Sequence, residues 1–365
     1  MENKQYLSEQ IITYIGNKRA LLKQIDEKIT EVKRLSDKEK ITACDLFSGS
    51  GIVSRLLKQH CSILLANDLE AYSEVINNCY LTNKSEFPEE DFDHYLNVLN
   101  KAIKDKPIEG IITKYYAPKD TNDVKENERC FYTHENAVLI DSYRYYIDEL
   151  VPEDLRVFFM ARLLTEASIH TNTSGVFKGF YKNKKGIGQF GGEGRNALSR
   201  IMGTIKIDRP VLSNYECDHT VFRQDANLLV KKLMPLDLVY IDTPYDQHPY
   251  GSNYFMLNLI LENKLPENVS RVSGIPSDWN RSSYNKANMA LSTMEDLISH
   301  IYSRFVLISY NNEGFIQKEE MENMLIKYGH LITDAVKYNA FRGSRNLSER
   351  SIYTNEYFFL LEKDL

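Results

Sequence analysis

The fold of this chain is predicted most directly from one stretch, Leu238-Val239-Tyr240-Ile241-Asp242-Thr243-Pro244-Tyr245. Its first four residues suit a strand that is buried on both faces, as in a parallel sheet. Pro244 ends this strand because proline has no N–H to donate, and it favours an extended Thr243. Ligands of open α/β sheets bind beyond the carboxyl ends of the strands, so Asp242 and Tyr245 are expected beside a ligand. The alternative is a strand followed by an ordinary turn that contains an aspartate.

A second predicted strand, at residues 41–45, runs into a glycine-rich turn and then into a helical pattern at residues 52–57. The turn has the pattern D-x-F-x-G-x-G, in which Gly49 and Gly51 let the backbone pass close to a ligand. The free N–H groups at the start of the helix favour an anionic group. The pattern is neither a P-loop nor G-x-G-x-x-G. Asp45, at the end of the strand, suits a cationic group of the ligand better than a pyrophosphate, which it would repel.

Two further carboxylates come after predicted strands. Asp68 follows residues 63–66 and lies roughly 20 residues beyond the glycines, where an acidic residue commonly binds ribose hydroxyls. Asp225 ends the segment 221–225 and is a carboxylate at a third strand end. The alternative interpretation is a bare α/β scaffold in which these residues only cap turns.

The alternation of strands and helices is interrupted between residues 72 and 215. Helical periodicity recurs in this region, at residues 72–81, 92–104, 136–148 and 155–167. Strand patterns then resume, among them residues 305–312, 336–341 and 356–361. We therefore predict a discontinuous α/β domain, formed by residues 1–71 and 216–365, with an inserted, mainly helical region at residues 72–215.

The insertion ends in a loop at residues 174–195 that is rich in glycine and lysine. Aromatic side chains lie among the basic ones, which suits contact with a phosphate backbone and with bases, while a solvated loop is the alternative. The predicted nucleic-acid-binding residues are Lys178, Lys182, Lys184, Lys185 and Arg195, with Arg342 and Arg345 from a second basic group. A match to G-x-G-x-x-G at residues 186–191 follows lysines and not a strand, so we do not interpret it as a nucleotide-binding turn. The formal net charge of −6 does not by itself favour nucleic acid.

The composition limits the class of protein. No apolar run is long enough to cross a membrane, and the N-terminus does not begin a signal peptide. The 5 cysteines are scattered without a C-x-x-C pair, and the 8 histidines show no H-E-x-x-H spacing. We therefore expect no membrane span, no disulfide framework and no metal site, and we expect the chain in a reducing cytoplasm.

These motifs, in this order, resemble those of the α-class DNA adenine-N6 methyltransferases, the Dam-like group. The resemblance spans nearly the whole chain and rests on residues 14–18, the D-x-F-x-G-x-G turn, Asp68, Asp225 and the tetrapeptide Asp242-Thr243-Pro244-Tyr245. The insertion stands between the cofactor-binding half and the tetrapeptide, which is the order of the α class. Within the group the chain is most similar to methyltransferases of restriction–modification systems, which implies a bacterial or phage origin.

The resemblance implies a Rossmann-like, S-adenosylmethionine-dependent methyltransferase sheet whose inserted region recognises the DNA target. Asp45 would face the ammonium of the cofactor, Asp68 its ribose hydroxyls and Asp225 its adenine amino group. Lys18 would lie near the methionine carboxylate or the target base. The implied cofactor-binding residues are Tyr14, Gly16, Asn17, Lys18, Asp45, Phe47, Ser48, Gly49, Gly51, Asp68, Leu69, Asp225, Ala226 and Asp242.

The resemblance also implies a reaction. The target adenine is expected to leave the duplex and stack on Tyr245, while Asp242 polarises its amino group for direct methyl transfer. The implied catalytic residues are Asp242, Thr243, Pro244 and Tyr245. The family usually has proline where Thr243 stands, but a threonine still supplies the main-chain carbonyl that accepts an amino hydrogen, so we expect activity.

Other interpretations stay open on the sequence alone. Similar tetrapeptides serve the amino methylation of cytosine N4, RNA or a protein amide, and Thr243 also suits a catalytically silent DNA-binding homologue. A cytosine-C5 enzyme would need a cysteine after a proline, and none of the 5 cysteines has that neighbour. The expected partners are double-stranded DNA and a cognate restriction endonuclease, with no membrane and no metal.

Overall fold

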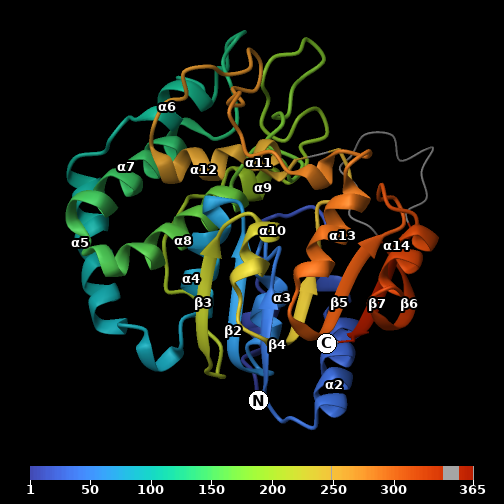
Figure 1. The fold of residues 1–365 in the computed structure, drawn as a ribbon. Coiled ribbons are helices and arrows are strands. Elements are labelled where there is room, and N and C mark those ends of the chain that lie inside the picture. The colour runs from blue at the N-terminus through green and yellow to red at the C-terminus, as the bar shows by residue number, and fades with distance from the viewer. Residues whose placement is uncertain (248, 340–352, 365) are drawn as a thin grey trace.

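A seven-stranded sheet, in the order β3-β2-β1-β4-β5-β7-β6, forms the centre of the computed structural model (Figure 1). The structure describes residues 1–247, 249–339 and 353–364. The strands are β1 (Ile41–Asp45), β2 (Cys61–Asp68), β3 (Asp218–Arg223), β4 (Leu236–Ile241), β5 (Ser303–Asn311), β6 (Gly329–Asn339) and β7 (Tyr353–Lys363). The first five in chain order run parallel, whereas β7 is antiparallel to β5 and to β6. The predicted α/β, Rossmann-like sheet is confirmed.

The strand order creates a switch point between β1 and β4. From β1 the chain moves outward to β2 and β3, and it returns to β4 on the other side of β1. The connections after β1 and β4 therefore leave the sheet in opposite directions, which opens a crevice at the carboxyl ends of these strands.

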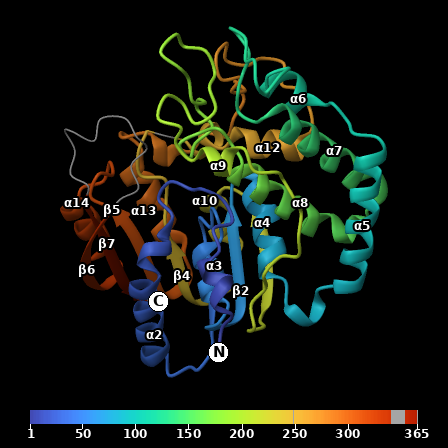
Figure 2. The same cartoon turned by 180° about the vertical axis from the view of Figure 1, so that it is seen from behind.

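Helices cover both faces of the sheet (Figure 1, and from behind in Figure 2), and alternate residues of β4 pack against these two layers. Leu238 and Tyr240 share a core with α2 (Leu22–Ser36) and α3 (Ile52–Leu57). Val239 and Ile241 share the opposite core with α10 (Ala226–Leu229), α13 (Ala290–His300) and α14 (Lys318–Leu325). The apolar run of the strand is buried on both faces because helices cover both sides of the sheet.

A third core lies beside the sheet and contains the helices of the inserted region. They are α4 (Ala71–Leu81), α5 (Glu89–Asp105), α6 (Ile111–Tyr116), α7 (His134–Leu150) and α8 (Glu153–Ile169), followed by the short α9 (Leu198–Ile201). Stacked rings of Phe92 and Phe159, with centroids 4.3 Å apart, join α5 to α8. The four helices predicted for this region are present, whereas α6 and the short α9 were not predicted.

Two segments outside residues 72–215 pack in this third core. One is α12 (Phe255–Glu262), which follows the short α11 (Tyr250–Asn253) and buries five of its residues. The other is the N-terminal segment with α1 (Lys4–Ser8), where the Tyr6 hydroxyl donates to the Tyr80 carbonyl at 2.6 Å. The boundaries at residues 71 and 216 thus divide the sequence but not the packing, and the division into two domains stays a prediction.

Candidate active site

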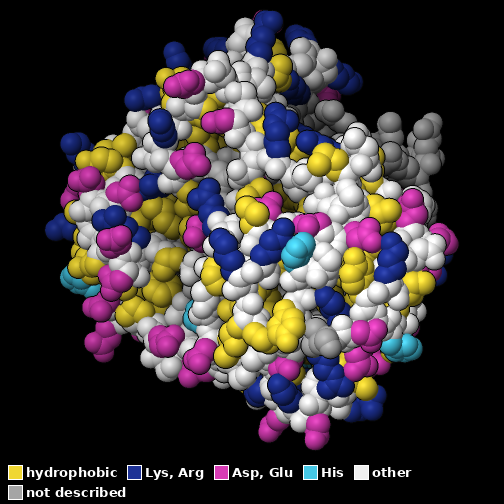
Figure 3. All heavy atoms as spheres, in the orientation of Figure 1, with side chains coloured by type: hydrophobic (Ala, Val, Ile, Leu, Met, Phe, Trp, Pro, Cys, Tyr) yellow, Lys and Arg dark blue, Asp and Glu magenta, His cyan; other side chains and the backbone are white. Residues whose placement is uncertain are grey.

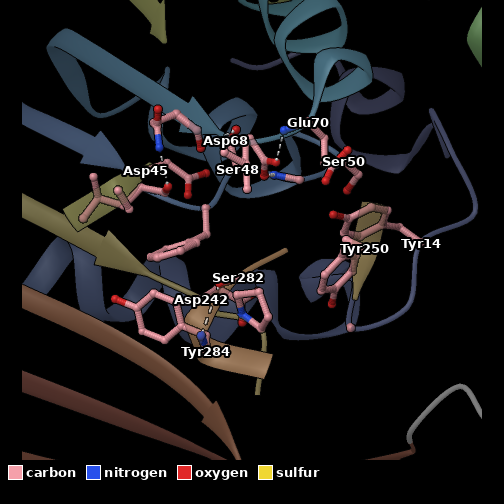
Figure 4. A pocket seen from close by; sticks show the side chains of 18 of the residues that line it. Tyr14, Asp45, Ser48, Ser50, Asp68, Glu70, Asp242, Tyr250, Ser282 and Tyr284 are labelled. Carbon is pink, nitrogen blue, oxygen red and sulfur yellow. Dashed lines mark hydrogen bonds between the residues drawn. The ribbon is translucent and has the colours of Figure 1, made fainter. Parts of the chain in front are cut away.

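A cavity opens at the carboxyl edge of the sheet, where β1, β2 and β4 end (Figure 4). It has about 900 Å³ of empty space, part of which is open to solvent. The predicted site residues that line it are Tyr14, Gly16, Asn17, Lys18, Asp45, Phe47, Ser48, Gly49, Asp68, Leu69, Asp225, Ala226, Asp242 and Pro244. Three predicted residues, Gly51, Thr243 and Tyr245, lie outside its lining.

The turn after β1 requires glycine at two positions. Gly49 and Gly51 have φ angles of 50° and 75°, in the left-handed region that favours glycine. A Cβ atom on Gly49 would lie 2.8 Å from the Tyr14 ring, and one on Gly51 would lie 2.8 Å from Asn77 Oδ1. Gly49 therefore brings backbone to the cavity wall, whereas Gly51 allows α3 to begin next to Asn77.

Asp45, the last residue of β1, places a buried carboxylate in the cavity wall. Its Oδ2 accepts a hydrogen bond from Ser54 Oγ at 2.7 Å, while its Oδ1 has no partner with hydrogen-bond geometry among the described residues. Burial raises the pKa of Asp45 to about 7. A buried carboxylate oxygen without a partner costs free energy until a donor meets it, so Asp45 suits the cationic end of a ligand.

Asp68, the last residue of β2, is held in place by main-chain donors. It accepts hydrogen bonds from the N–H groups of Gly49 at 2.8 Å and Glu70 at 3.0 Å. Burial raises the pKa of Asp68, and these bonds oppose the increase. Because a carboxylate has about four acceptor positions, Asp68 keeps capacity for further donors such as two hydroxyl groups.

The wall after β3 combines a carboxylate with aromatic rings. Asp225 accepts the N–H of Leu228 at 3.1 Å and lies exposed in the cavity wall. Phe47 and Tyr284 meet there edge to face, with ring centroids 5.4 Å apart. Flat apolar rings next to an acceptor suit a heterocycle that carries an amino group.

Asp242 follows β4 and forms a buried ionic cluster with two residues from distant parts of the chain. Lys18 Nζ lies 2.8 Å from Asp242 Oδ1 and 3.1 Å from Glu356 Oε1. Burial raises the pKa of Asp242 to about 6, and the ammonium of Lys18 opposes the increase. The side chains of Lys18 and Glu356 are 3% and 0% exposed, whereas that of Asp242 is 19% exposed. Asp242 is therefore the most accessible of the three.

The remainder of the tetrapeptide lies beside this ionic cluster. Thr243 is buried, and its Oγ1 has no partner with hydrogen-bond geometry among the described residues. The Tyr245 ring is 6.0 Å from Lys18 Nζ and meets Tyr310 edge to face at 6.1 Å. Tyr245 thus lies beside the ionic cluster without lining the cavity.

Several cavity residues were not predicted, among them Glu70, Tyr250, Asn280 and Tyr284. Burial raises the pKa of Glu70 to about 7, and its place two residues after Asp68 is a signal that could have identified it. Tyr250 stacks on Tyr14 with centroids 4.9 Å apart, on the side of the cavity away from Asp45 (Figure 4). No strand end or motif marks the segment from 249 to 285, so sequence reasoning had no signal there.

The predicted DNA-binding lysines lie on the loop between α8 and α9, and Lys and Arg side chains are frequent on the upper part of this face (Figure 3). All five predicted residues of the loop are exposed. The side chain of Asn172 anchors the loop, because it donates to the Cys130 carbonyl at 2.8 Å and accepts the Gly191 N–H at 2.9 Å. A Cβ on Gly188 would lie 2.5 Å from Cys130 Cβ, so this glycine of the G-x-G-x-x-G match serves packing. Arg342 and Arg345 lie outside the described residues.

Two kinds of feature are missing from the part of the chain that the structure describes. No group of three or more His, Cys, Asp and Glu side chains is arranged to hold a metal ion there. None of the helices in that part combines the length and the apolar character that crossing a bilayer requires.

Comparison with known proteins agrees with this geometry. The family of D12 class N6 adenine-specific DNA methyltransferases matches residues 14–324. The chain is 30% identical over 356 residues to the type II methyltransferase M.CviAII of Paramecium bursaria Chlorella virus 1, with 96% of this chain and 98% of the relative covered. It is 29% identical over 362 residues to the type II methyltransferase M.NlaIII of Neisseria lactamica, with 96% and 99% covered. It is also 28% identical to the type II methyltransferase M.FokI of Planomicrobium okeanokoites, of which it spans 53%. The chain belongs to the D12 class N6 adenine-specific DNA methyltransferases.

Proposed function

We propose that this protein transfers a methyl group from S-adenosylmethionine to N6 of an adenine flipped out of a specific site in double-stranded DNA. Its biological role would be that of the modification enzyme of a restriction–modification system, with a cognate restriction endonuclease as partner. The observation that carries the proposal is Asp242, a carboxylate on the rim between the cavity and Tyr245. The relatives that match over their whole length are named type II methyltransferases, which supports the restriction–modification assignment.

The cavity residues fit S-adenosylmethionine. The unpartnered Oδ1 of Asp45 is a counterpart for the ammonium of its methionine end. Asp68 has acceptor capacity for the ribose hydroxyls, and the Phe47 and Tyr284 rings with Asp225 suit its adenine. When bound, this cofactor supplies a methyl group on a positively charged sulfur.

The chain's own residues would bind and orient the target base. Tyr245 would stack on the extruded adenine, because its ring adjoins Asp242 but does not line the cofactor cavity. Asp242 would accept one amino hydrogen and the Thr243 carbonyl the other, which turns the nitrogen lone pair out of the ring. Since Pro244 restricts the backbone of Thr243, that carbonyl is held without a proline at position 243.

The exposed lysines of the loop between α8 and α9 would contact the DNA backbone. Their charges can neutralise phosphates without reading the sequence, which is a positioning role. The inserted helical region from which the loop emerges would then recognise the target.

The proposal is tested by expressing the chain in cells without DNA methylation. Mass spectrometry of the nucleosides should show N6-methyladenine, and sequencing that reports modified bases should place it in one short motif. Cells that express an Asp242→Ala variant are the matched control and should show none. N4-methylcytosine as the product would contradict the proposal. Specific DNA binding without any methylated base would instead identify a catalytically silent homologue.

A further inference from the structure

Glu356 is a fully buried carboxylate that the reaction outlined above leaves without a role. It is near the start of β7, where it pairs with Asn311 of β5. Because β7 runs antiparallel to β5, its first residues lie at the same edge of the sheet as the end of β4. Its alternation with Phe358 and Leu360 places the side chain on the sheet face that carries Tyr240, which is where Lys18 approaches.

Four donors surround the Glu356 carboxylate. Besides Lys18 at 3.1 Å, they are Ser309 Oγ at 2.6 Å, Tyr338 Oη at 3.3 Å and Asn311 Nδ2 at 3.4 Å. This network of donors fixes the Glu356 carboxylate in one position. Lys18 is thereby fixed between two carboxylates, of which only Asp242 faces the reaction.

The charges of the ionic cluster decide what happens when Asp242 gains a proton. Glu356, Lys18 and Asp242 together carry one net negative charge when all three are ionised. Protonation of Asp242 leaves a neutral ion pair between Lys18 and Glu356. Without the Glu356 charge, the same protonation would leave the buried Lys18 ammonium unpaired, which is strongly unfavourable. Among the residues that the structure describes, the other titratable groups that face Asp242 are Asp45 from β1, Tyr240 from β4, Tyr245 from the tetrapeptide, Tyr250 from α11 and Tyr338 from β6.

The proposed reaction requires a proton acceptor. The amino nitrogen of adenine forms a bond to the methyl carbon with its lone pair, and the carbon–sulfur bond of the donor breaks with its electron pair left on sulfur. The nitrogen then carries one proton too many. Asp242, which is bonded to an amino hydrogen in the proposed complex, is the nearest carboxylate that can take it.

We propose that Glu356 is a positioning residue that keeps Lys18 paired and so allows Asp242 to accept the proton released from the methylated amino group. This inference rests on the proposed function for the reaction, but the pairing itself is a property of the protein alone. Lys18 and Glu356 act on Asp242 in opposite directions: the ammonium makes the carboxylate a weaker base, and Glu356 restores its basicity.

Titration of the protein without DNA or cofactor tests the pairing directly. The pKa of Asp242 is read from its carboxyl ¹³C signal, which is assigned by its disappearance in Asp242→Asn. Glu356→Gln should lower this pKa, because a neighbouring negative charge is lost, and Lys18→Met should raise it. A matched control is Glu362→Gln, on the same strand but exposed and paired with Arg304 at 2.8 Å, which should leave the pKa unchanged. If Glu356→Gln and Lys18→Met shift the pKa of Asp242 in the same direction, or if neither shifts it, the proposal is overturned.

Single-turnover methylation as a function of pH tests the consequence. With saturating cofactor and DNA, Glu356→Gln should lower the plateau of the pH–rate profile by about tenfold or more, as expected for impaired proton transfer. It should also move the acidic limb of this profile, where the rate falls with falling pH, to lower pH. Lys18→Met should move this limb to higher pH. Where Glu356→Gln does not fold, Ser309→Ala removes one donor that favours the charged form of Glu356, and the pairing predicts a smaller shift of the Asp242 pKa in the same direction as with Glu356→Gln. A Glu356→Gln enzyme with the wild-type rate and limb would refute the role, whereas a wild-type protein without methyl transfer would instead refute the proposed function.

Discussion

Asp45 and Asp242 are carboxylates at the ends of neighbouring strands, and their different surroundings suit them to different roles. Asp242 has an ammonium 2.8 Å away that opposes the effect of burial on its pKa. No cation lies within ion-pair distance of Asp45 among the described residues, where its Oδ2 accepts from the Ser54 hydroxyl and its Oδ1 has no partner with hydrogen-bond geometry. The cation that Asp45 lacks is expected from the ligand, whereas Asp242 is already paired and keeps its acceptor capacity for a neutral amino group.

The pKa of Asp45 predicts how cofactor affinity depends on pH. Only the ionised carboxylate attracts the cofactor's ammonium, and the ionised fraction falls below the pKa of about 7. Affinity for S-adenosylmethionine should therefore weaken as the pH falls from 8 to 6, approaching tenfold per unit below 7. Titration calorimetry at several pH values measures this. Asp45→Asn should bind about 10-fold or more weakly at pH 8, since a hydrogen bond to a charged group contributes about 1.5–3 kcal/mol, and with a flatter pH dependence. An Asn variant with the wild-type affinity and slope would remove Asp45 from the ammonium site.

Thr243 offers a second test at the scale of one residue. Its hydroxyl is buried without a partner among the described residues, so the side chain has no visible polar role. If only its carbonyl serves the reaction, Thr243→Pro should leave single-turnover methylation within about tenfold, a barrier change under about 1.4 kcal/mol. Complete loss of activity in a folded Thr243→Pro protein would show that the hydroxyl takes part.

The strands β1, β2, β4 and β5 could be predicted from the sequence because each is a largely apolar run that ends in, or is followed by, a polar residue. Because the strands β1 to β4 are parallel, their last residues lie at one edge of the sheet. For this reason Asp45, Asp68 and Asp242 could be predicted together. Glu356 could not. It begins an apolar run instead of ending one, and only the antiparallel direction of β7 brings it to the same edge. Strand direction depends on tertiary pairing, which no local pattern in β7 reveals.

The loop between α8 and α9 is predicted to contact phosphates. Changing Lys182, Lys184 and Lys185 to alanine together should weaken DNA binding and reduce the slope of log affinity against log salt by about 0.9 per lost contact. The matched control removes the same charge at Lys33, Lys38 and Lys40, near the turn before β1 at the opposite edge of the sheet. DNA binding by the two triple variants is compared by fluorescence anisotropy at several salt concentrations. Equal effects of the two triple variants would show that the loop acts only through net charge.

In the turn after β4, we predict that Tyr245 serves the extrusion of the base, whereas Asp242 serves the chemical step. Tyr245→Ala should reduce the fluorescence increase of 2-aminopurine at the target position, because stacking on an aromatic ring contributes about 1–3 kcal/mol per base. Tyr245→Phe keeps the ring face and should remain close to wild type. Tyr310→Phe, which changes the ring that meets Tyr245 edge to face, controls for packing of this turn. A full fluorescence increase with Tyr245→Ala would exclude the stacking role.

The whole molecule brings the two ends of the chain to one site. Lys18 comes from the N-terminal segment and Glu356 from the last strand, while Asp242 lies between them in sequence. The helical insertion is joined to the sheet in the same way, since α12 and the N-terminal segment pack in its core. The sequence could not predict these long-range contacts. Helical periodicity identified the helices of the insertion, but it did not reveal which other segments share their core.

The central claim is that Asp242 performs chemistry while other residues bind cofactor and DNA. Single-turnover methylation by Asp242→Ala, beside calorimetric affinity for S-adenosylmethionine and anisotropy with target DNA, tests it most directly. Methyl transfer should be nearly abolished, because an interaction made in the transition state is lost, while both ligands should still bind. DNA binding is even expected to tighten when a carboxylate near the phosphates is removed. An Asp242→Ala protein that methylates at close to the wild-type rate would contradict the account.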